Sequence, residues 1–369
     1  MVSRSFSVDG TSLHEVERRF SKRAREVAIL LVYDRPDRIN ERPKLARSFF
    51  AERCVSDDQL ARMIEAYRSV GAYVELFEGE KPFIEALTNG HIASIARPVK
   101  LVYDGSEGGV LPGGFKPGRK SLIPVVADAY GLTCANSNAY ACAIGRHKFH
   151  YATLLRSLGI HCPRTWHFRP NQTWAANGRP PLGVRVIAKS TFESWSVGIS
   201  ADSVFVVDNT CDDRVREIAE QIGQAVTVQE FIGGREVSVP LFACPHLVVG
   251  PPVQALLARA SVDPDAVVTI EDHLAEDGVS YPQFDSDTAL TVRLQQDTVA
   301  AFDALELEHF ARLDFRVDAS DCPWLFDVAV SPGISCRSAA YSSLSHLDLA
   351  YPEFLRVVIG ATLAADGLI

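Results

Sequence analysis

Three features that would assign this chain to common protein classes are absent from its sequence. It has no apolar run of about 18 residues, so no part of it is expected to span a membrane. Its net charge of −9 argues against nucleic acid or an anionic membrane as the main partner. The basic segment Met1–Glu26 lacks the apolar centre of a signal peptide, and we expect a frayed leader or a first helix there. These absences favour a cytoplasmic protein.

The cysteines also lack the spacings that define common cysteine sites. None of the eight forms a Cys-x-x-Cys pair, and no histidine lies at zinc-knuckle spacing from them. Most lie in apolar surroundings, which is typical of reduced, structural cysteines in the cytoplasm. At Cys336, just beyond Ser331-Pro332-Gly333, a catalytic thiol is an alternative to a structural role.

What the sequence does contain is an alternation of strand-like and helical segments. Its 369 residues are enough for two or three compact units, and 47% hydrophobic with 22% charged residues is ordinary for a globular protein. The apolar run Val27–Tyr33 predicts a buried parallel strand. We expect three domains: an N-terminal α/β domain (1–138), a central α+β domain (139–242) and a C-terminal domain (243–369).

Two lysines stand out in the central unit. Lys148 lies in a predicted helix over Ala139–Leu158, and Lys189 directly follows a short apolar strand at Arg185–Ala188. At the end of such a strand, the charge of Lys189 is expected to point into a cleft. The alternative for both lysines is a surface side chain whose methylene groups cover apolar neighbours.

Near the C-terminal end, two apolar runs each carry one aspartate. Asp314 and Asp327 flank a turn at Asp318–Pro323, and the pattern predicts a hairpin that brings them together beside Arg312. Two carboxylates held close in an apolar context repel each other unless a cation lies between them. Magnesium with a nucleotide phosphate fits, because it needs few protein carboxylates. Two solvated strand-end aspartates are the alternative.

These motifs occur in a fixed order: Lys148, Lys189, the loop Glu193–Gly198, the run Gln229–Glu236, and Arg312 with the aspartate pair. In that order they resemble the ATP-grasp superfamily, and within it the D-alanine–D-alanine ligases, over most of the chain. The resemblance implies an α/β ATP-grasp fold with ATP between the central and C-terminal units. It further implies Mg²⁺ as a cofactor, amino acids as small-molecule substrates and a homodimer.

In the central unit, the resemblance assigns the two lysines to the α and β phosphates of ATP. The loop Glu193-Ser194-Trp195-Ser196-Val197-Gly198 resembles the family's E-G-S-S-V-G lid, whose backbone N–H groups cap the β and γ phosphates. Glu193, Ser196, Val197 and Gly198 match, whereas Ser194 and Trp195 replace small residues. Trp195 is expected either to reach a bulky substrate or to pack against a neighbouring strand.

The run Val228–Glu236 resembles the hinge that clasps adenine. Backbone groups of Glu230 and Ile232 would bond the base, and Phe231 would pack beside it. Glu236 would accept hydrogen bonds from the ribose hydroxyls, with an exposed strand-end carboxylate as the alternative. Gln229 stands where the family often has Glu.

At the C-terminal motifs, the resemblance makes Asp314 and Asp327 the magnesium ligands. Position 327 usually holds Glu, and Ala329 replaces an Asn that would be a third ligand. Arg312 and the Gly333 N–H would stabilise a tetrahedral transition state. Just beyond the turn, Ser338 and the neighbouring Arg337 are candidates for binding the carboxylate of the second substrate.

Three further segments were weighed. Glu52, in Ala51–Ser56, resembles the glutamate that orients the ammonium group of the first amino acid, with a helix-start glutamate as the alternative. The loop Ile270–Asp285 lacks the family's Lys-Tyr pair, and His273 either replaces that lysine or lies in a solvated acidic loop. Gly113–Ser121 approaches a P-loop, but Arg119 breaks the spacing, so we set that interpretation aside.

The predicted function is an ATP-dependent carboxylate–amine ligase that proceeds through an acyl phosphate. The departures at Trp195 and Ala329 favour an amino acid other than D-alanine, such as a larger or non-proteinogenic one from specialised metabolism. One alternative is a D-alanine–D-alanine ligase. Another is a non-catalytic nucleotide-binding protein with an impaired metal site.

Overall fold

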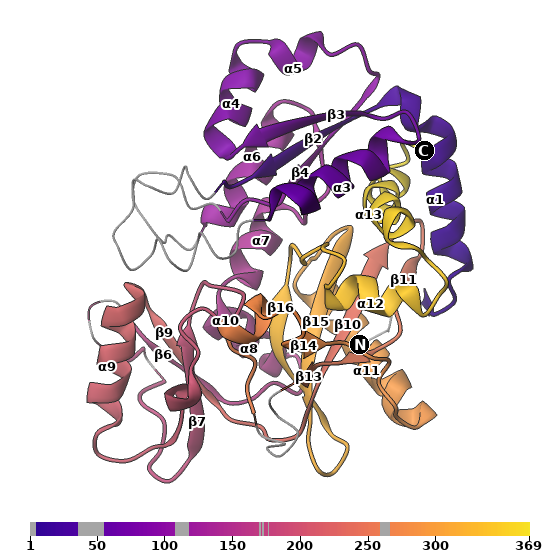
Figure 1. The fold of residues 1–369 in the computed structure, drawn as a ribbon. Coiled ribbons are helices and arrows are strands. Elements are labelled where there is room, and N and C mark those ends of the chain that lie inside the picture. Colours follow the sequence, from indigo (N-terminus) through magenta and orange to yellow (C-terminus); the bar gives the residue numbers. More distant parts are fainter. Residues whose placement is uncertain are drawn as a thin grey trace.

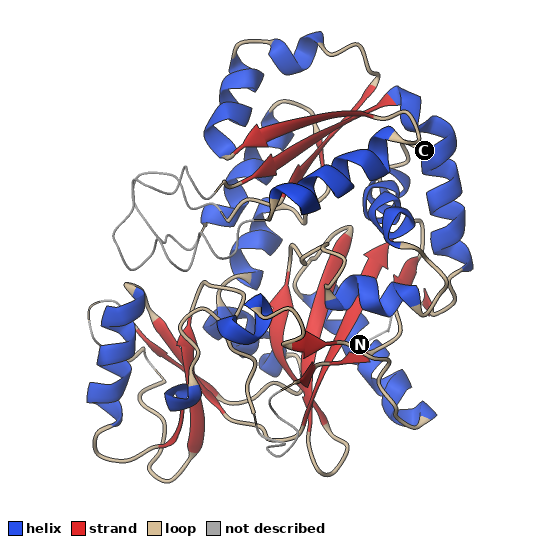
Figure 2. Cartoon of the chain, in the orientation of Figure 1, coloured by secondary structure: helices blue, strands red, loops and turns tan. Residues whose placement is uncertain are grey.

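Sheets with helices around them make up the part of the chain that the structure, a computed structural model, describes (Figure 1; Figure 2). The described residues are 5–35, 55–107, 118–169, 171, 173–175, 177–258 and 266–369. Figure 1 places the N-terminal parallel sheet at the top, the central sheet at the lower left and the C-terminal sheet at the lower right. No helix in these ranges is long and apolar enough to cross a bilayer.

The N-terminal sheet is parallel, in the order β3-β2-β4-β5. Its strands and flanking helices are β2 (Val27–Tyr33), α3 (Asp57–Arg68), β3 (Tyr73–Glu78), α4 (Glu80–Thr88), α5 (His91–Ser94), β4 (Val99–Asp104), α6 (Leu122–Ala129) and β5 (Thr133–Cys134). Every residue of β2 is buried, because Ile29 and Leu31 pack into one core while Leu30 and Val32 pack into another. The predicted buried strand at Val27–Tyr33 is therefore confirmed.

The predicted helix over Ala139–Leu158 is wrong in its continuity. The chain forms two helices, α7 (Ala139–Gly145) and α8 (Lys148–Ser157), with a break at Arg146 and His147. The His147 ring accepts a hydrogen bond from the His150 N–H at 3.4 Å and so caps α8. Because of this break, Lys148 begins a helix rather than lying in the middle of one.

The central sheet is antiparallel, in the order β6-β9-β7-β8. Its elements are β6 (Thr165–Phe168), β7 (Arg185–Ser190), the short 3-10 helix η4 (Ala201–Ser203), β8 (Val204–Val206), α9 (Cys211–Ile222) and β9 (Val226–Glu230). Alternate residues such as Phe168, Val186 and Val228 pack against α9. The intervening residues, which include Lys189 and Gln229, therefore face the other side of the sheet.

The C-terminal sheet has the order β1-β11-β10-β15-β16, and β12 also pairs with β10. Its elements are β1 (Phe6–Ser7), β10 (Arg235–Ala243), β11 (Leu247–Val249), β12 (Val253–Gln254), α11 (Thr288–Ala304), β15 (Phe310–Val317) and β16 (Pro323–Ala329). Between β12 and α11 lie β13 (Leu256–Leu257), α10 (Ile270–Leu274) and β14 (Val279–Ser280), and β13 pairs with β14. Apolar residues of β10, β15 and α11 form one core, so the opposite face of the sheet is left to polar residues.

Helices from the two ends of the chain pack against each other. α1 (Thr11–Arg23) and the short 3-10 helix η1 (Ala24–Glu26) lead into β2, and α12 (Ala339–Ser345) leads into α13 (Tyr351–Ala365). α1 lies beside α13 in Figure 1, and the two share one core. The domain limits at 138 and 242 remain a proposal. Because β10 pairs with β15 along its length, we favour a second limit before residue 235.

Candidate nucleotide and metal site

The polar face of the C-terminal sheet carries the acidic and basic residues that the sequence singled out. Asp314 lies directly opposite Asp327 in the β15–β16 hairpin, so the predicted hairpin is confirmed. On the other side of β15, Arg316 lies opposite Glu236 of β10. Residues opposite one another, and residues two apart along one strand, share a face of the sheet. One face therefore gathers Glu236, Arg312, Asp314, Arg316 and Asp327.

Each aspartate of the pair already has its own hydrogen-bond donors. Asp314 accepts two hydrogen bonds of 2.8 Å from Arg312 and one of 2.7 Å from the Ser238 hydroxyl. Asp327 accepts one of 3.0 Å from the Tyr151 hydroxyl. Burial alone would raise the pKa of Asp327, but Lys148 and Lys189 hold that pKa below its ordinary value. The ionised form of Asp327, which a metal ligand requires, is thus favoured.

These carboxylates fit Mg²⁺, which prefers oxygen ligands and keeps several from water or phosphate. Across the described ranges, no group of three or more His, Cys, Asp or Glu side chains has metal-binding geometry. Ala329 lies opposite Arg312, on the face that carries the two aspartates, and offers no oxygen. A magnesium ion would therefore be held by Asp314 and Asp327, with the remaining ligands from phosphate and water.

A β-bulge at Phe326 shapes the floor of this site. Asp314 pairs with Asp327 and Phe315 pairs with Leu325, so Phe326 is the extra residue of β16. Its carbonyl oxygen accepts hydrogen bonds from the Tyr151 hydroxyl at 3.1 Å and from Lys189 Nζ at 3.3 Å. The Lys189 ammonium also lies 5.2 Å from the centre of the Phe326 ring. The bulge thus holds Lys189 above the aspartate hairpin.

The two lysines meet near Asp327 from different elements. Lys148 Nζ lies 3.7 Å from Asp327 Oδ1 and donates to the backbone oxygen of Glu193. Lys189 is the fifth residue of β7, one residue beyond the predicted strand. Burial and the nearby Lys148 lower the pKa of Lys189 to about 8, although Asp327 opposes that shift. Their roles at the phosphates remain a prediction.

The nucleotide pocket lies between the central sheet and the C-terminal sheet. Seven of the predicted nucleotide-binding residues line it: Gln229–Ile232, Lys189, Ser196 and Glu236. The Glu230 and Phe231 N–H groups donate to the Arg164 and Arg185 oxygens at 2.8 and 2.9 Å. Of the backbone groups proposed for the base, the Glu230 N–H is therefore already engaged.

Apolar residues and one arginine complete that pocket. Its walls include Pro163, Ile187, Ile199, Val268 and Phe326, and Arg316 also lines it. Arg316 Nη2 lies 3.1 Å from Glu236 Oε2. Burial raises the pKa of Glu236, and Arg316 opposes that shift. An apolar slot with one acidic group at its edge suits a flat base followed by a ribose.

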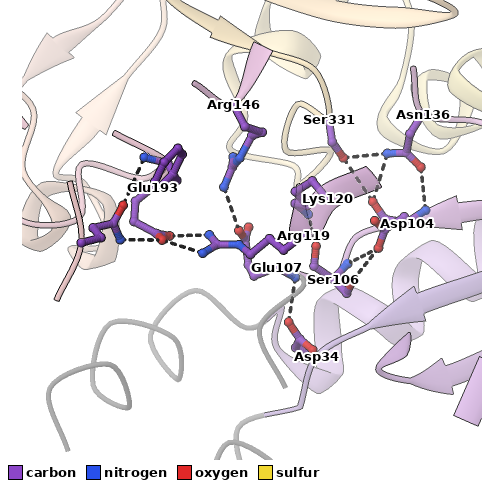
Figure 3. Close-up of polar contacts among 12 residues, drawn as sticks. Asp34, Asp104, Ser106, Glu107, Arg119, Lys120, Asn136, Arg146, Glu193 and Ser331 are labelled. Carbon is purple, nitrogen blue, oxygen red and sulfur yellow. Dashed lines mark hydrogen bonds and ion pairs between the residues drawn. The ribbon is translucent and has the colours of Figure 1, made fainter. Parts of the chain in front are cut away.

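The lid loop differs from a simple cap over the phosphates. Trp195 and Ser196 adopt φ values of 58° and 55°, a left-handed conformation that is uncommon outside glycine. The Trp195 ring lies 5.5 Å from the His273 ring of α10, so it packs against a helix rather than a strand. Val197 is buried, and a Cβ at Gly198 would lie 2.6 Å from Ile222. The Glu193 side chain is buried as well and bonds Arg119 (Figure 3).

The residues proposed for the second substrate follow β16. Gly333 is exposed, and a Cβ there would meet open space. The turn before it is held by Asn136, which donates to the Ser331 hydroxyl at 2.7 Å (Figure 3). Arg337 donates to the Ala275 and Glu276 oxygens, and the Ser338 hydroxyl caps α12. Arg337 and Ser338 therefore already have protein partners.

Three of the weighed segments have mixed outcomes. Glu52 lies outside the described residues. His273 is half-buried in α10, and burial, followed by Arg312, lowers its pKa to about 4, whereas residues 274–277 of the same loop are exposed. In the set-aside P-loop segment, residues 118–121 are described; there Arg119–Ser121 forms the 3-10 helix η3, and Arg119 and Lys120 are buried.

Sequence reasoning missed Phe326, Arg316, Tyr151 and Arg119. The two-residue alternation that links Arg312 and Asp314 continues to Arg316 and could have identified it. A bulge has no sequence signature here, and Arg119 lies 74 residues from its partner Glu193.

Comparison with known proteins places this geometry in a family. Residues 154–360, more than half of the chain, match the family described as D-ala D-ala ligase C-terminus. A D-alanine–D-alanine ligase of Hydrogenovibrio crunogenus is 23% identical, covering 89% of this chain and 97% of the relative.

Two solved structures share the fold. The D-alanine–D-alanine ligase of Bacillus anthracis, complexed with ATP, has a TM-score of 0.63 at 14% identity and covers 91% of this chain and 97% of its own. The VanG D-Ala:D-Ser ligase of Enterococcus faecalis has a TM-score of 0.62 at 17% identity and covers 91% and 99%. The expected α/β ATP-grasp fold is confirmed.

Proposed function

The chain belongs to the D-ala D-ala ligase C-terminus family, and from that premise we propose that it joins an amino acid other than D-alanine to a second amine. Members of the family are ADP-forming ligases of carbon–nitrogen bonds. This chain is accordingly an ATP-dependent carboxylate–amine ligase that uses Mg²⁺.

The observation that supports these site assignments most directly is the juxtaposition of pocket and hairpin. Lys189 lines the pocket together with Gln229–Ile232 and Glu236, and its Nζ donates to the carbonyl oxygen of Phe326, the residue next to Asp327 in the Asp314–Asp327 hairpin. In the proposal, the base lies in the apolar slot and Glu236 accepts hydrogen bonds from the ribose. The phosphates reach the two lysines, and the two aspartates hold Mg²⁺, which offsets phosphate charge and orients the transfer.

The proposed reaction has two steps. A substrate carboxylate oxygen attacks the γ-phosphorus of ATP, the bond to the β-phosphate oxygen breaks, and ADP leaves. The uncharged amine of the second substrate then attacks the acyl carbon, phosphate leaves, and the nitrogen loses a proton to give the amide. Arg312 and the Gly333 N–H would stabilise the oxyanion of that tetrahedral intermediate. For this, Arg312 must exchange a bond to Asp314 for one to the substrate.

Departures at substrate-facing positions support a substrate other than D-alanine. The lid carries Trp195 beside His273, where the resemblance would place small residues and a lysine. Ala329 removes a metal ligand, and the loop from Ile270 to Asp285 has no Lys or Arg. The VanG D-Ala:D-Ser ligase of Enterococcus faecalis shares this fold, so the acceptor varies among similar proteins. A larger or non-proteinogenic amino acid is the substrate class that we propose.

Two alternatives each have an observation in their favour. The name of the Hydrogenovibrio crunogenus relative favours a D-alanine–D-alanine ligase. Ala329 favours a nucleotide-binding protein with an impaired metal site. A cytoplasmic homodimer that contacts through its N-terminal domain is part of our proposal, and light scattering on the purified protein tests the dimer.

ADP release in the presence of Mg²⁺ and pooled amino acids distinguishes these functions. The pools contain L, D and non-proteinogenic amino acids, and Lys189→Ala is the inactive control. We expect ADP with one pool other than D-alanine and none with the control. Rapid ADP release and dipeptide formation with D-alanine alone would replace our proposal with the first alternative. ATP binding without turnover in any pool would favour the second.

A further inference from the structure

A buried ion pair connects the N-terminal domain to the first residue of the lid. Arg119 Nη1 and Nη2 donate to Glu193 Oε1 and Oε2 at 2.8 and 2.7 Å (Figure 3). The two side chains are only 5% and 1% exposed. A paired fork of this kind fixes the orientation of both groups as well as their distance. The Glu193 carboxylate is therefore held in one place relative to the N-terminal domain.

The same carboxylate is tied to the central domain from the other side. Gln224, which follows α9, donates to Glu193 Oε1 at 3.0 Å. The Gln224 side-chain oxygen in turn accepts the Phe192 N–H at 3.2 Å. Glu193 thus receives hydrogen bonds from Arg119 of the N-terminal domain and from Gln224 of its own, central domain.

The backbone of Glu193 reaches the proposed phosphate site. Its carbonyl oxygen accepts a hydrogen bond from Lys148 Nζ, and Lys148 lies 3.7 Å from Asp327. Arg119 itself does not line the nucleotide pocket. In the proposal it therefore acts on the phosphates through Glu193 and Lys148 rather than by direct contact.

The lid residues that follow Glu193 need such an anchor. Trp195 and Ser196 both hold left-handed backbone conformations, which persist only where the surroundings fix them. Arg119 fixes the loop two residues earlier. Lys120, next to it, donates to the Ser106 carbonyl, and the Ser106 hydroxyl donates to Asp104 at the end of β4 (Figure 3). The anchor is thereby continuous with the N-terminal sheet.

We infer that Arg119 is a positioning residue of the phosphate site, which latches the lid to the N-terminal domain through Glu193 and fixes Lys148. This inference rests on the proposed nucleotide site and extends it to a residue outside the pocket. Its consequence is coupling: the N-terminal domain must be docked for the lid to close over the phosphates. A closed lid also keeps water from the acyl phosphate.

Nucleotide binding by the full-length protein tests this inference without knowledge of the amino-acid substrates. The probes are Mg²⁺ with the non-hydrolysable ATP analogue AMPPNP, and adenosine alone, both titrated by calorimetry. We expect Arg119→Met to weaken AMPPNP binding about tenfold or more, because the buried Glu193 carboxylate will rearrange once it loses its arginine partner. Adenosine binding should stay within about twofold, since the slot at Glu230–Ile232 is untouched. Arg119→Lys should recover part of the loss.

Two further variants separate positioning from stability. Replacing both members of a buried pair by apolar groups often restores stability, so Arg119→Met with Glu193→Met should melt near the natural protein yet still bind AMPPNP weakly. Arg356→Met breaks an ion pair of 2.7 Å with Glu17 between α13 and α1. This matched control, far from the lid, should leave both affinities unchanged.

The outcomes that overturn the latch are specific. The inference is wrong if Arg119→Met, or the double variant, folds and binds AMPPNP within about twofold of the natural protein. Equal losses for AMPPNP and adenosine would also overturn it, because they indicate general damage. If no amino-acid pool gives amide while the AMPPNP effect holds, the ligase proposal fails and the latch stands. If amide does form, the latch variants should release more than one ADP per amide.

Discussion

The two ends of the proposed nucleotide cleft are built on different principles. The adenosine end is an apolar slot, with walls such as Pro163, Ile187 and Phe231, and with backbone groups already engaged in the sheet. The phosphate end is a set of charges that neutralise one another: Arg312 with Asp314, and Lys148 with Asp327. The adenosine end has its shape before the ligand binds, whereas the charged groups of the phosphate end must exchange their protein partners for the ligand.

This difference indicates where binding and catalysis are controlled. An apolar slot contributes affinity by burial, which depends little on pH or salt. Buried charges must lose old partners as they gain the phosphates, so their net contribution depends on geometry and on protonation. Variants and conditions should therefore separate adenosine binding from phosphate binding.

The largest expected effect comes from Lys189→Met. Lys189 is the buried cation that reaches the pocket from β7, and its loss removes charge stabilisation at the transferred phosphate. We expect ADP release to fall roughly 10²–10³-fold, the range for removing one pre-aimed donor. Adenosine affinity should change less than about twofold. A comparable loss of adenosine affinity would contradict the division of the cleft.

Glu236→Ala should have the next largest effect, and it should not discriminate between ligands. Removing the carboxylate deletes the proposed ribose acceptor and leaves Arg316 without this ion-pair partner. Charged hydrogen bonds contribute about 1.5–3 kcal/mol, so adenosine and AMPPNP should both bind about 10–100-fold more weakly. Glu236→Gln, which keeps an acceptor, should lose less. Calorimetry measures the affinity for each ligand. If only the affinity for AMPPNP falls, Glu236 acts at the phosphate end and not on the ribose.

The pH dependence should differ between the two ends by a moderate amount. In the free protein the pKa of Lys189 is about 8, below its ordinary value, because of burial and then Lys148. Bound phosphate raises that pKa, so binding above pH 8 takes up a proton. AMPPNP affinity should be insensitive to this group below about pH 8 and fall about tenfold per pH unit above it. Adenosine affinity should be flat, and Lys189→Met should abolish the slope.

Ala329→Asn should give the smallest change. The new side chain lies opposite Arg312 and adds an oxygen near the two aspartates. In an active natural protein, we expect the half-saturating Mg²⁺ concentration to fall a few-fold with little change in maximal rate. Ala329→Leu, which has similar size and no ligand, is the control. Activity that appears only with Asn would favour the metal-impaired alternative.

How much of this site can be predicted from the sequence depends on how far apart the contacting residues lie along the chain. The Asp314–Asp327 hairpin and the strand that carries Lys189 follow from local alternation, which the sequence displays. The bulge at Phe326 and the helix break at His147 do not, because each depends on tertiary packing around one residue. Arg119 was set aside with a failed P-loop match, and its partner Glu193 is 74 residues away. The hardest part of the cleft to predict was therefore the set of contacts between residues distant in the chain, such as Arg119 with Glu193.

The pairing of chain ends has a consequence for synthesis. Phe6 pairs with Leu247, and the apolar face of α1, including Val16 and Phe20, packs on α13 at Gly360. At ribosomal rates of about 5–20 residues per second, α1 emerges tens of seconds before its partner exists. Until α13 is made, the apolar face of α1 lacks its native partner and can contact only chaperones or other parts of the nascent chain. The contact between α1 and α13 joins residues far apart in the chain, and contacts of this kind are expected to slow folding.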